Sequence, residues 1–314
     1  MTEAFLMKKE LNKIIMTTKT KNKILKSSLV RIILGLIICL GSVIIGQQIF
    51  LKIPGVATLN PDARNFIKGI FVSALVIGSY WIFYSKYEKR VIIELSTKKI
   101  GKKLLAGIIT GTVLQCLTIL VIYFYGGFKV IAVNPVSIII IPFTVAFTVA
   151  ILEEILLRGI VFRITEEKWG STIALTISGV IFGGLHLTNP HVTIVSFLCI
   201  TVVGVLLSAA YMYYRNLWVP IAIHFAWNFT QNGIFGAITS GNEKTSSLLT
   251  TSITGPEILT GGQFGPEGSV QALLICFIAA IIIILQLNKQ NKINLRPLKN
   301  TSILPHKVFI NHIL

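Results

Sequence analysis

The amino-acid sequence predicts an all-α fold: a polytopic membrane helix bundle with about eight transmembrane helices. Of its 314 residues, 53% are hydrophobic and only 13% are charged, whereas soluble globular domains are roughly 25% charged. The mean hydropathy of +0.77 and repeated apolar runs of about 20 residues, the length that crosses a bilayer, indicate the same class. A soluble enzyme or binding domain is therefore excluded.

The expected helices follow from these apolar runs. The runs at 104–125 and 270–288 predict spans without ambiguity, whereas those at 67–84, 172–188 and 218–235 are short or polar and could be tilted, kinked or partly re-entrant. Totals of seven or nine helices therefore stay open. The eight expected helices are 29–51, 67–84, 104–125, 136–162, 172–188, 192–213, 218–235 and 270–288.

The basic residues predict the orientation of these helices. Lys and Arg concentrate in cytoplasmic loops, and 24 of the 29 basic residues fall in alternate segments, counted from the N-terminus. We therefore expect a multi-pass protein of the cell membrane with both termini in the cytoplasm. The formal charge of +17 reports this orientation and contact with the lipid bilayer. A nucleic-acid partner is not expected, because the basic residues flank the spans and no aromatic residues are interleaved with them.

The predicted domain organisation is simple. A basic cytoplasmic arm, 1–28, precedes a transmembrane domain, 29–288, and a basic tail, 289–314, follows it. One long polar segment, 236–269, is rich in Gly, Ser and Thr and is expected on the outer side. It is interpreted as a flexible connector, and a lid over a site is the alternative.

Two adjacent glutamates in an apolar run are the strongest functional signal. A carboxylate at membrane depth costs roughly 2.5 to 3.5 kcal/mol even on an insertion scale, so Glu153 and Glu154 indicate a site. Residues four apart share a helix face, so Glu154 is expected to pair with Arg158, a structural interaction that neutralises both charges. Glu153 points about 100° away and is left free to meet groups from other helices.

Further polar residues lie in two later apolar runs. In 172–188, Phe182 precedes His186 by one turn, with two glycines between them that allow a neighbouring helix to approach. In 218–235, His224 and Asn228 share a face. Each of these residues alone could simply hold helices together, but jointly they resemble a general base, a residue that orients water, and an oxyanion hole.

The joint pattern resembles the CAAX protease and bacteriocin-processing (CPBP, or Abi) family over a core of about 136–235. Its motifs read Glu153-Glu154-x-x-x-Arg158, Phe182-x-x-x-His186 and His224-x-x-x-Asn228. The resemblance implies an intramembrane endopeptidase that acts on a membrane-associated protein or peptide. It also implies the roles: Glu153 activates the attacking water, His186 helps to hold the water, and His224 with Asn228 stabilises the oxyanion. Glu154, Arg158 and Phe182 would support the site.

Whether a metal takes part stays open at this point. Glu153, His186 and His224 could supply three ligands to Zn²⁺, as in a metalloprotease. If Glu153 bound a metal, however, no second acid would be free to act as base, because Glu154 is engaged by Arg158. We therefore favour a reaction without a cofactor.

Two other function classes fit the same residues. A non-catalytic bacteriocin-immunity or membrane scaffold protein would use the polar cluster only to hold helices together. A proton-coupled transporter would use Glu153 as a proton relay.

Overall fold

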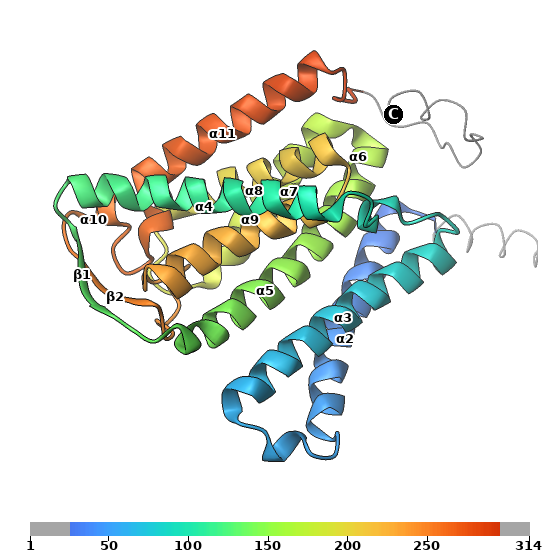
Figure 1. Ribbon diagram of the computed structural model, residues 1–314. Coiled ribbons are helices and arrows are strands. Elements are labelled where there is room, and N and C mark those ends of the chain that lie inside the picture. Colours follow the sequence, from blue (N-terminus) through green and yellow to red (C-terminus); the bar gives the residue numbers. More distant parts are fainter. Residues whose placement is uncertain (1–25, 296–314) are drawn as a thin grey trace, which may run out of the picture.

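The computed structural model describes residues 26–295, which form a bundle of long helices with a small two-stranded sheet at one end (Figure 1). Within this range, seven helices are long and apolar enough to cross a membrane. The chain is therefore a membrane-embedded, polytopic helical bundle, as the composition predicts. Nearly all of the predicted basic arm, and the tail beyond residue 295, lie outside the described residues.

The helices follow the predicted apolar runs closely. The run predicted at 136–162 continues to Trp169, so this candidate span is 34 residues long. It consists of a 3₁₀ turn, Val136–Ile139, followed by α5, a π-helical segment and α6. The helical elements of the bundle are α2 (Ser28–Leu51), α3 (Pro61–Tyr87), α4 (Ile100–Phe124), α5 (Ile140–Glu154), the π-helical segment Ile155–Phe162, α6 (Arg163–Trp169), α7 (Ser171–Leu185), α8 (Ile194–Tyr214), α9 (Trp218–Asn228) and α11 (Val270–Lys289).

The helix expected at 218–235, one of the runs that could be tilted, kinked or partly re-entrant, is present but is shorter than each of the seven candidate spans. The segment is helical, but α9 has only 11 residues and continues as a π-helical segment of 6 residues, Phe229–Ile234. Together these are too short to count among the seven candidate spans. Its side chains from Val219 to His224 are all buried, because α9 packs against α4, α5 and α8. A helix that is apolar all round is typical of such an interior position.

Local signals explain where several helices begin. Thr193 and Ser196 form a capping box at the start of α8, which satisfies amide groups that have no partner within the helix. Ser269 accepts a hydrogen bond from the backbone of Ala272 at the start of α11. Gly170, with φ of 85°, separates α6 from α7, a backbone conformation that glycine adopts without strain.

Glycines allow α7 and α8 to pack closely, as the sequence predicts for this region. A Cβ atom at Gly183 would lie 2.1 Å from Thr201 Oγ1, and one at Gly204 would lie 2.9 Å from the Cα atom of Gly179. Small residues at such contacts let helix backbones approach each other in a membrane. At Gly184, by contrast, there is open space.

The sheet was not predicted. β1 (Phe128–Val133) pairs antiparallel with β2 (Leu249–Ile253) at the end of the bundle where α4 ends (Figure 1). The strand β2 belongs to the polar segment 236–269, which also contains α10 (Glu257–Thr260) and a 3₁₀ turn, Pro266–Gly268. This polar segment therefore contains three short regular elements joined by irregular backbone.

A network of ion pairs lies at the opposite end of the bundle. Arg31 on α2 contacts Glu88 at 2.8 Å and Glu167 at 2.7 Å, and Arg163 on α6 contacts Glu88 at 2.9 Å. Burial would raise the pKa of Glu88, but Arg163 and Arg31 hold this pKa below its ordinary value. The network joins α2, the end of α3 and the helix that carries Glu153.

Candidate functional site

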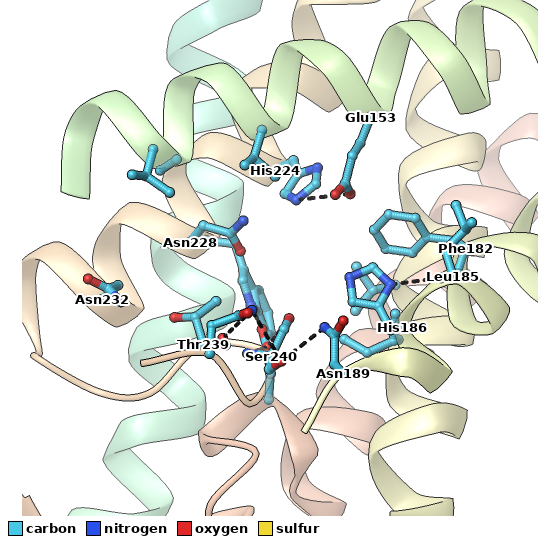
Figure 2. Close-up of a pocket in the computed structure, with 18 of the residues that line it drawn as sticks. Glu153, Phe182, Leu185, His186, Asn189, His224, Asn228, Asn232, Thr239 and Ser240 are labelled. Carbon is cyan, nitrogen blue, oxygen red and sulfur yellow. Dashed lines mark hydrogen bonds and ion pairs between the residues drawn. The ribbon is translucent and has the colours of Figure 1, made fainter. Parts of the chain in front are cut away.

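A cavity of about 490 Å³ brings the predicted site residues together. Its lining includes Glu153, Phe182, His186, His224 and Asn228, which come from α5, α7, the turn after α7, and α9. Figure 2 shows these side chains around one common space. Glu154 and Arg158 do not line the cavity; both are fully buried behind it.

Glu153 and His224 approach each other across the boundary between α5 and α9. Glu153 Oε2 lies 4.0 Å from His224 Nε2, and the two side chains are 28% and 8% exposed. The Oε2 atom is buried and has no hydrogen-bond partner among the described residues. Glu153 is thus the carboxylate that meets groups from other helices, as its position on α5 predicts. At 4.0 Å from His224 Nε2, this oxygen keeps an acceptor position that no described group uses.

Glu154 links two residues behind this contact. Its Oε1 atom accepts hydrogen bonds from Arg158 Nη1 at 2.7 Å and from His224 Nδ1 at 3.0 Å. The expected pair with Arg158 is therefore present, whereas the contact with His224 was not predicted. Arg158 also donates from Nη2 to the Gly204 carbonyl oxygen on α8 at 2.8 Å. A buried ion pair with such additional hydrogen bonds avoids an isolated charge.

The hydrogen bond to Glu154 fixes the ring of His224. Because a carboxylate oxygen accepts, His224 Nδ1 carries the proton of this bond. The other ring nitrogen, Nε2, then faces Glu153 at the edge of the cavity. This is the arrangement in which a carboxylate orients a histidine for chemistry at its second nitrogen.

His186 is oriented by its own helix. Its Nδ1 atom lies 2.8 Å from the carbonyl oxygen of Phe182, which can only accept, so Nδ1 carries the proton and Nε2 is free. The Phe182 ring lies 5.0 Å from the His186 ring and 5.9 Å from the His224 ring, and Arg158 stacks over it at 4.7 Å. Phe182 therefore separates the buried ion pair from the cavity and contacts both histidines.

Two π-helical segments begin directly after site residues. The α-helical pattern of α5 ends at Glu154, and that of α9 ends at Asn228. Insertions of this kind are rare and occur frequently at functional sites. They change the rotation of the following turns relative to an uninterrupted α-helix.

The comparison with protein families agrees with this geometry. Residues 135–230 match the family model for the type II CAAX prenyl endopeptidase, Rce1-like. The segment 135–230 is therefore similar to this endopeptidase family, and it is called the Rce1-like segment below. Its limits lie close to the predicted core of 136–235, and the match confirms the resemblance to CAAX proteases. Neither a curated protein nor a solved structure matches the chain. The Rce1-like family is a peptidase family, which supports an intramembrane endopeptidase at the family level.

Several residues of the cavity lie outside the predicted set. Asn189 follows His186, and Asn232 follows Asn228, at positions still close to the predicted motifs. Apolar residues of α5 and α8 also line the cavity, and further polar residues come from the polar segment beyond the Rce1-like segment. They include Glu267 in the glycine-rich run Gly261–Gly268. In the sequence, the position of this acidic residue within a glycine-rich run was the only indication that Glu267 belongs to the site. The residues that the polar segment contributes are Thr239, Ser240, Asn242, Glu243, Thr245 and Glu267.

A metal site is the other possibility for the predicted residues of the cavity. Within residues 26–295, no group of three or more His, Cys, Asp and Glu side chains lies close enough together to hold a metal ion. The candidate ligand set of Glu153, His186 and His224 in the Rce1-like segment therefore does not fit a metal in this arrangement. No step of the reaction below is assigned to a metal.

Proposed function

We propose that the chain is an intramembrane endopeptidase in which Glu153 activates a water molecule to attack a peptide bond. The observation that carries the proposal is the contact of Glu153 with His224 in a cavity that His186 and Asn228 also line. A carboxylate, two imidazoles and a carboxamide in one cavity can supply a base, a group that orients water and an oxyanion hole.

The proposed reaction begins with proton transfer to Glu153. The water oxygen attacks the peptide carbonyl carbon, and the proton that it loses goes to Glu153. His186 lines the cavity, and its Nε2 atom, the ring nitrogen that Phe182 does not engage, helps to hold this water. When the C–N bond breaks, the proton on Glu153 passes to the leaving amine. Atoms and charges balance with water as the only co-reactant.

Asn228 and His224 would stabilise the developing oxyanion. Asn228 can donate from its amide nitrogen in any protonation state, whereas His224 donates from Nε2 only when both ring nitrogens carry protons. The adjacent Glu153 and Glu154 would support such a cationic ring by charge. Glu154 and Arg158 hold the His224 ring and the helix that carries Glu153.

The proposed substrate is a membrane-associated protein or peptide. The cavity is lined by apolar side chains of α5 and α8 and by polar side chains of the segment 239–245. A peptide that is partly apolar and partly polar suits such a lining.

A cleavage assay tests the proposal. The purified full chain is reconstituted in liposomes with a peptide library, and products are identified by mass spectrometry beside Glu153→Gln as background and Glu257→Gln as a matched control. We expect defined cleavage by the wild type and by Glu257→Gln, and none by Glu153→Gln. Parallel samples with a chelator and with added Zn²⁺ should cleave at the same rate, and a many-fold change would contradict the metal-independent reaction. Cleavage that Glu153→Gln retains would contradict the role of Glu153.

A further inference from the structure

Glu267 is a buried acid that the proposed reaction does not use. It lies in the 3₁₀ turn Pro266–Gly268, its residue is 2% exposed, and it lines the cavity. No salt bridge joins it to a basic side chain among the described residues. A buried polar group of this kind is costly unless hydrogen bonds satisfy it, so its partners are informative.

Three donors meet the Glu267 carboxyl group. Oε2 accepts a hydrogen bond from Trp227 Nε1 at 3.1 Å, and Oε1 accepts from Ser240 Oγ at 2.6 Å and from the Ser240 backbone nitrogen. Trp227 stands between His224 and Asn228 on α9, and Ser240 lies at the cavity in the polar segment. One side chain therefore joins this segment to the helix that carries two site residues.

The same network reaches the second histidine. Asn189 Nδ2 donates to the carbonyl oxygen of Ser240 at 2.9 Å, and Asn189 follows His186 by three residues. Figure 2 shows Asn189 and Ser240 joined across the cavity below His186. Glu267 thus connects, through Trp227 on one side and through Ser240 and Asn189 on the other, the two chain segments that carry the histidines.

The backbone next to Glu267 has a conformation that requires glycine. Gly265 has φ of 108°, and a Cβ atom there would lie 2.1 Å from the carbonyl oxygen of Ile238, so only glycine fits. The neighbouring Phe264 is fully buried and packs in one cluster with Phe182 and Ile223. The glycine-rich run is therefore packed against the site.

We propose that Glu267 is a positioning residue that sets the spacing between His186 and the pair His224 and Asn228. The proposal rests on the proposed function, because spacing matters only if these residues act on one substrate. A displacement of about 1 Å at a catalytic group can cost up to 10²-fold in rate. Loss of the Glu267 contacts should therefore lower kcat, while KM changes little.

The test compares Glu267→Gln and Trp227→Phe with Glu257→Gln, which changes an exposed acid in the same polar segment. Full-length variants in liposomes are assayed for kcat and KM on a peptide that the wild type cleaves. Hydrogen–deuterium exchange of residues 187–191 and 239–245 gives a readout independent of activity. We expect kcat to fall at least tenfold in both test variants, KM to change less than threefold, and exchange to rise in both segments. Glu257→Gln should match the wild type.

A double variant separates positioning from general damage. If Glu267 acts through Trp227, the combined Glu267→Gln and Trp227→Phe changes should lower kcat no more than the larger single change does. Ser240→Ala is the substitute if Glu267→Gln does not fold. An unchanged kcat, or a rise in KM alone, would overturn the proposal even if exchange increased. If the wild type cleaves no peptide, the proposed function is contradicted. The proposed positioning by Glu267 is contradicted as well only if hydrogen–deuterium exchange is unchanged in the variants.

Discussion

His224 Nδ1 lies 3.0 Å from Glu154 Oε1, so the histidine on α9 is held by the second glutamate of α5 while its other ring nitrogen faces the first. The two adjacent glutamates thus contact the same imidazole ring from two sides. Glu154 is fully buried and bonded to Arg158, and Glu153 is partly open to the cavity. The difference in burial and contacts indicates a structural role for Glu154 and a role in the cavity for Glu153.

Replacing Glu154 should damage both stability and activity. Glu154→Gln leaves the Arg158 charge fully buried without its counterion, a change that typically costs about 3 to 5 kcal/mol. We expect a clearly lower melting temperature in detergent and a loss of cleavage, since the ring of His224 also loses its carboxylate. Thermal unfolding followed by tryptophan fluorescence measures the first effect. A variant as stable as the exposed control Glu257→Gln would contradict the structural task of Glu154.

Replacing Asn228 should lower the rate of cleavage without changing the fold. It lines the cavity near the end of α9, where the proposed reaction places the oxyanion. Removing one oxyanion donor typically lowers kcat by about 10² to 10³. We expect Asn228→Ala to show this loss with KM and melting temperature nearly unchanged, in steady-state assays beside Asn288→Ala, which changes an exposed asparagine near the end of α11. Equal losses in the two variants would argue against an oxyanion hole at Asn228.

The ion pairs at the other end of the bundle predict a pH-dependent stability. Glu94 lies between α3 and α4 and receives hydrogen bonds from Arg90 at 2.5 and 2.9 Å and from Tyr80. Burial would raise the pKa of Glu94, but the hydrogen bonds and charge of Arg90 hold it below the ordinary value of 4.5. A lowered pKa gives stability that is present above about pH 4.5 and is lost as the pH falls through the folded-state pKa.

Melting temperatures from pH 7 to pH 3 measure this dependence. The wild type should lose stability steeply below about pH 4.5. Glu94→Gln should be less stable at pH 7 and should lose less on acidification. The remaining slope is expected from Glu88, whose pKa is lowered as well. Parallel curves for the wild type and Glu94→Gln would contradict the assignment.

The orientation in the membrane remains a prediction that reporter fusions can test. If α9 and its π-helical continuation cross the membrane as an eighth span beside the seven candidate spans, the excess of basic residues in alternate segments predicts both termini in the cytoplasm and the polar segment 236–269 outside. A reporter active only outside the cytoplasm should therefore be inactive after residue 295 and active when inserted at Lys244. The reverse pattern would show that the orientation is inverted.

Local spacing predicted only part of this arrangement. The apolar runs gave the helices, and the four-residue interval gave the pair of Glu154 with Arg158. Glu153 on α5 and His186 after α7 line one cavity, although no residue interval relates positions on these two helices. Rotations and tilts between helices depend on packing across the bundle, which residue intervals do not encode.

Other features had no periodic signal. The strand β1 lies in an apolar stretch that could equally begin a helix, and its partner β2 is more than a hundred residues away in the sequence. The π-helical segment after Glu154 is as apolar as an α-helix would be, and the one after Asn228, Phe229–Ile234, is mostly polar; neither composition distinguishes a π-helix from an α-helix. The contacts of Glu267 with Trp227 and Ser240 join chain segments that only the folded molecule brings together.

The most direct test of the central claim is the rate at which Glu153→Gln cleaves a peptide substrate of the wild type. This substitution keeps the shape of the side chain and removes the proposed base. With an unchanged melting temperature, we expect kcat to fall by roughly 10³-fold, within the range for loss of a general base. Retention of more than a tenth of the wild-type kcat by the folded variant would contradict the activation of water by Glu153.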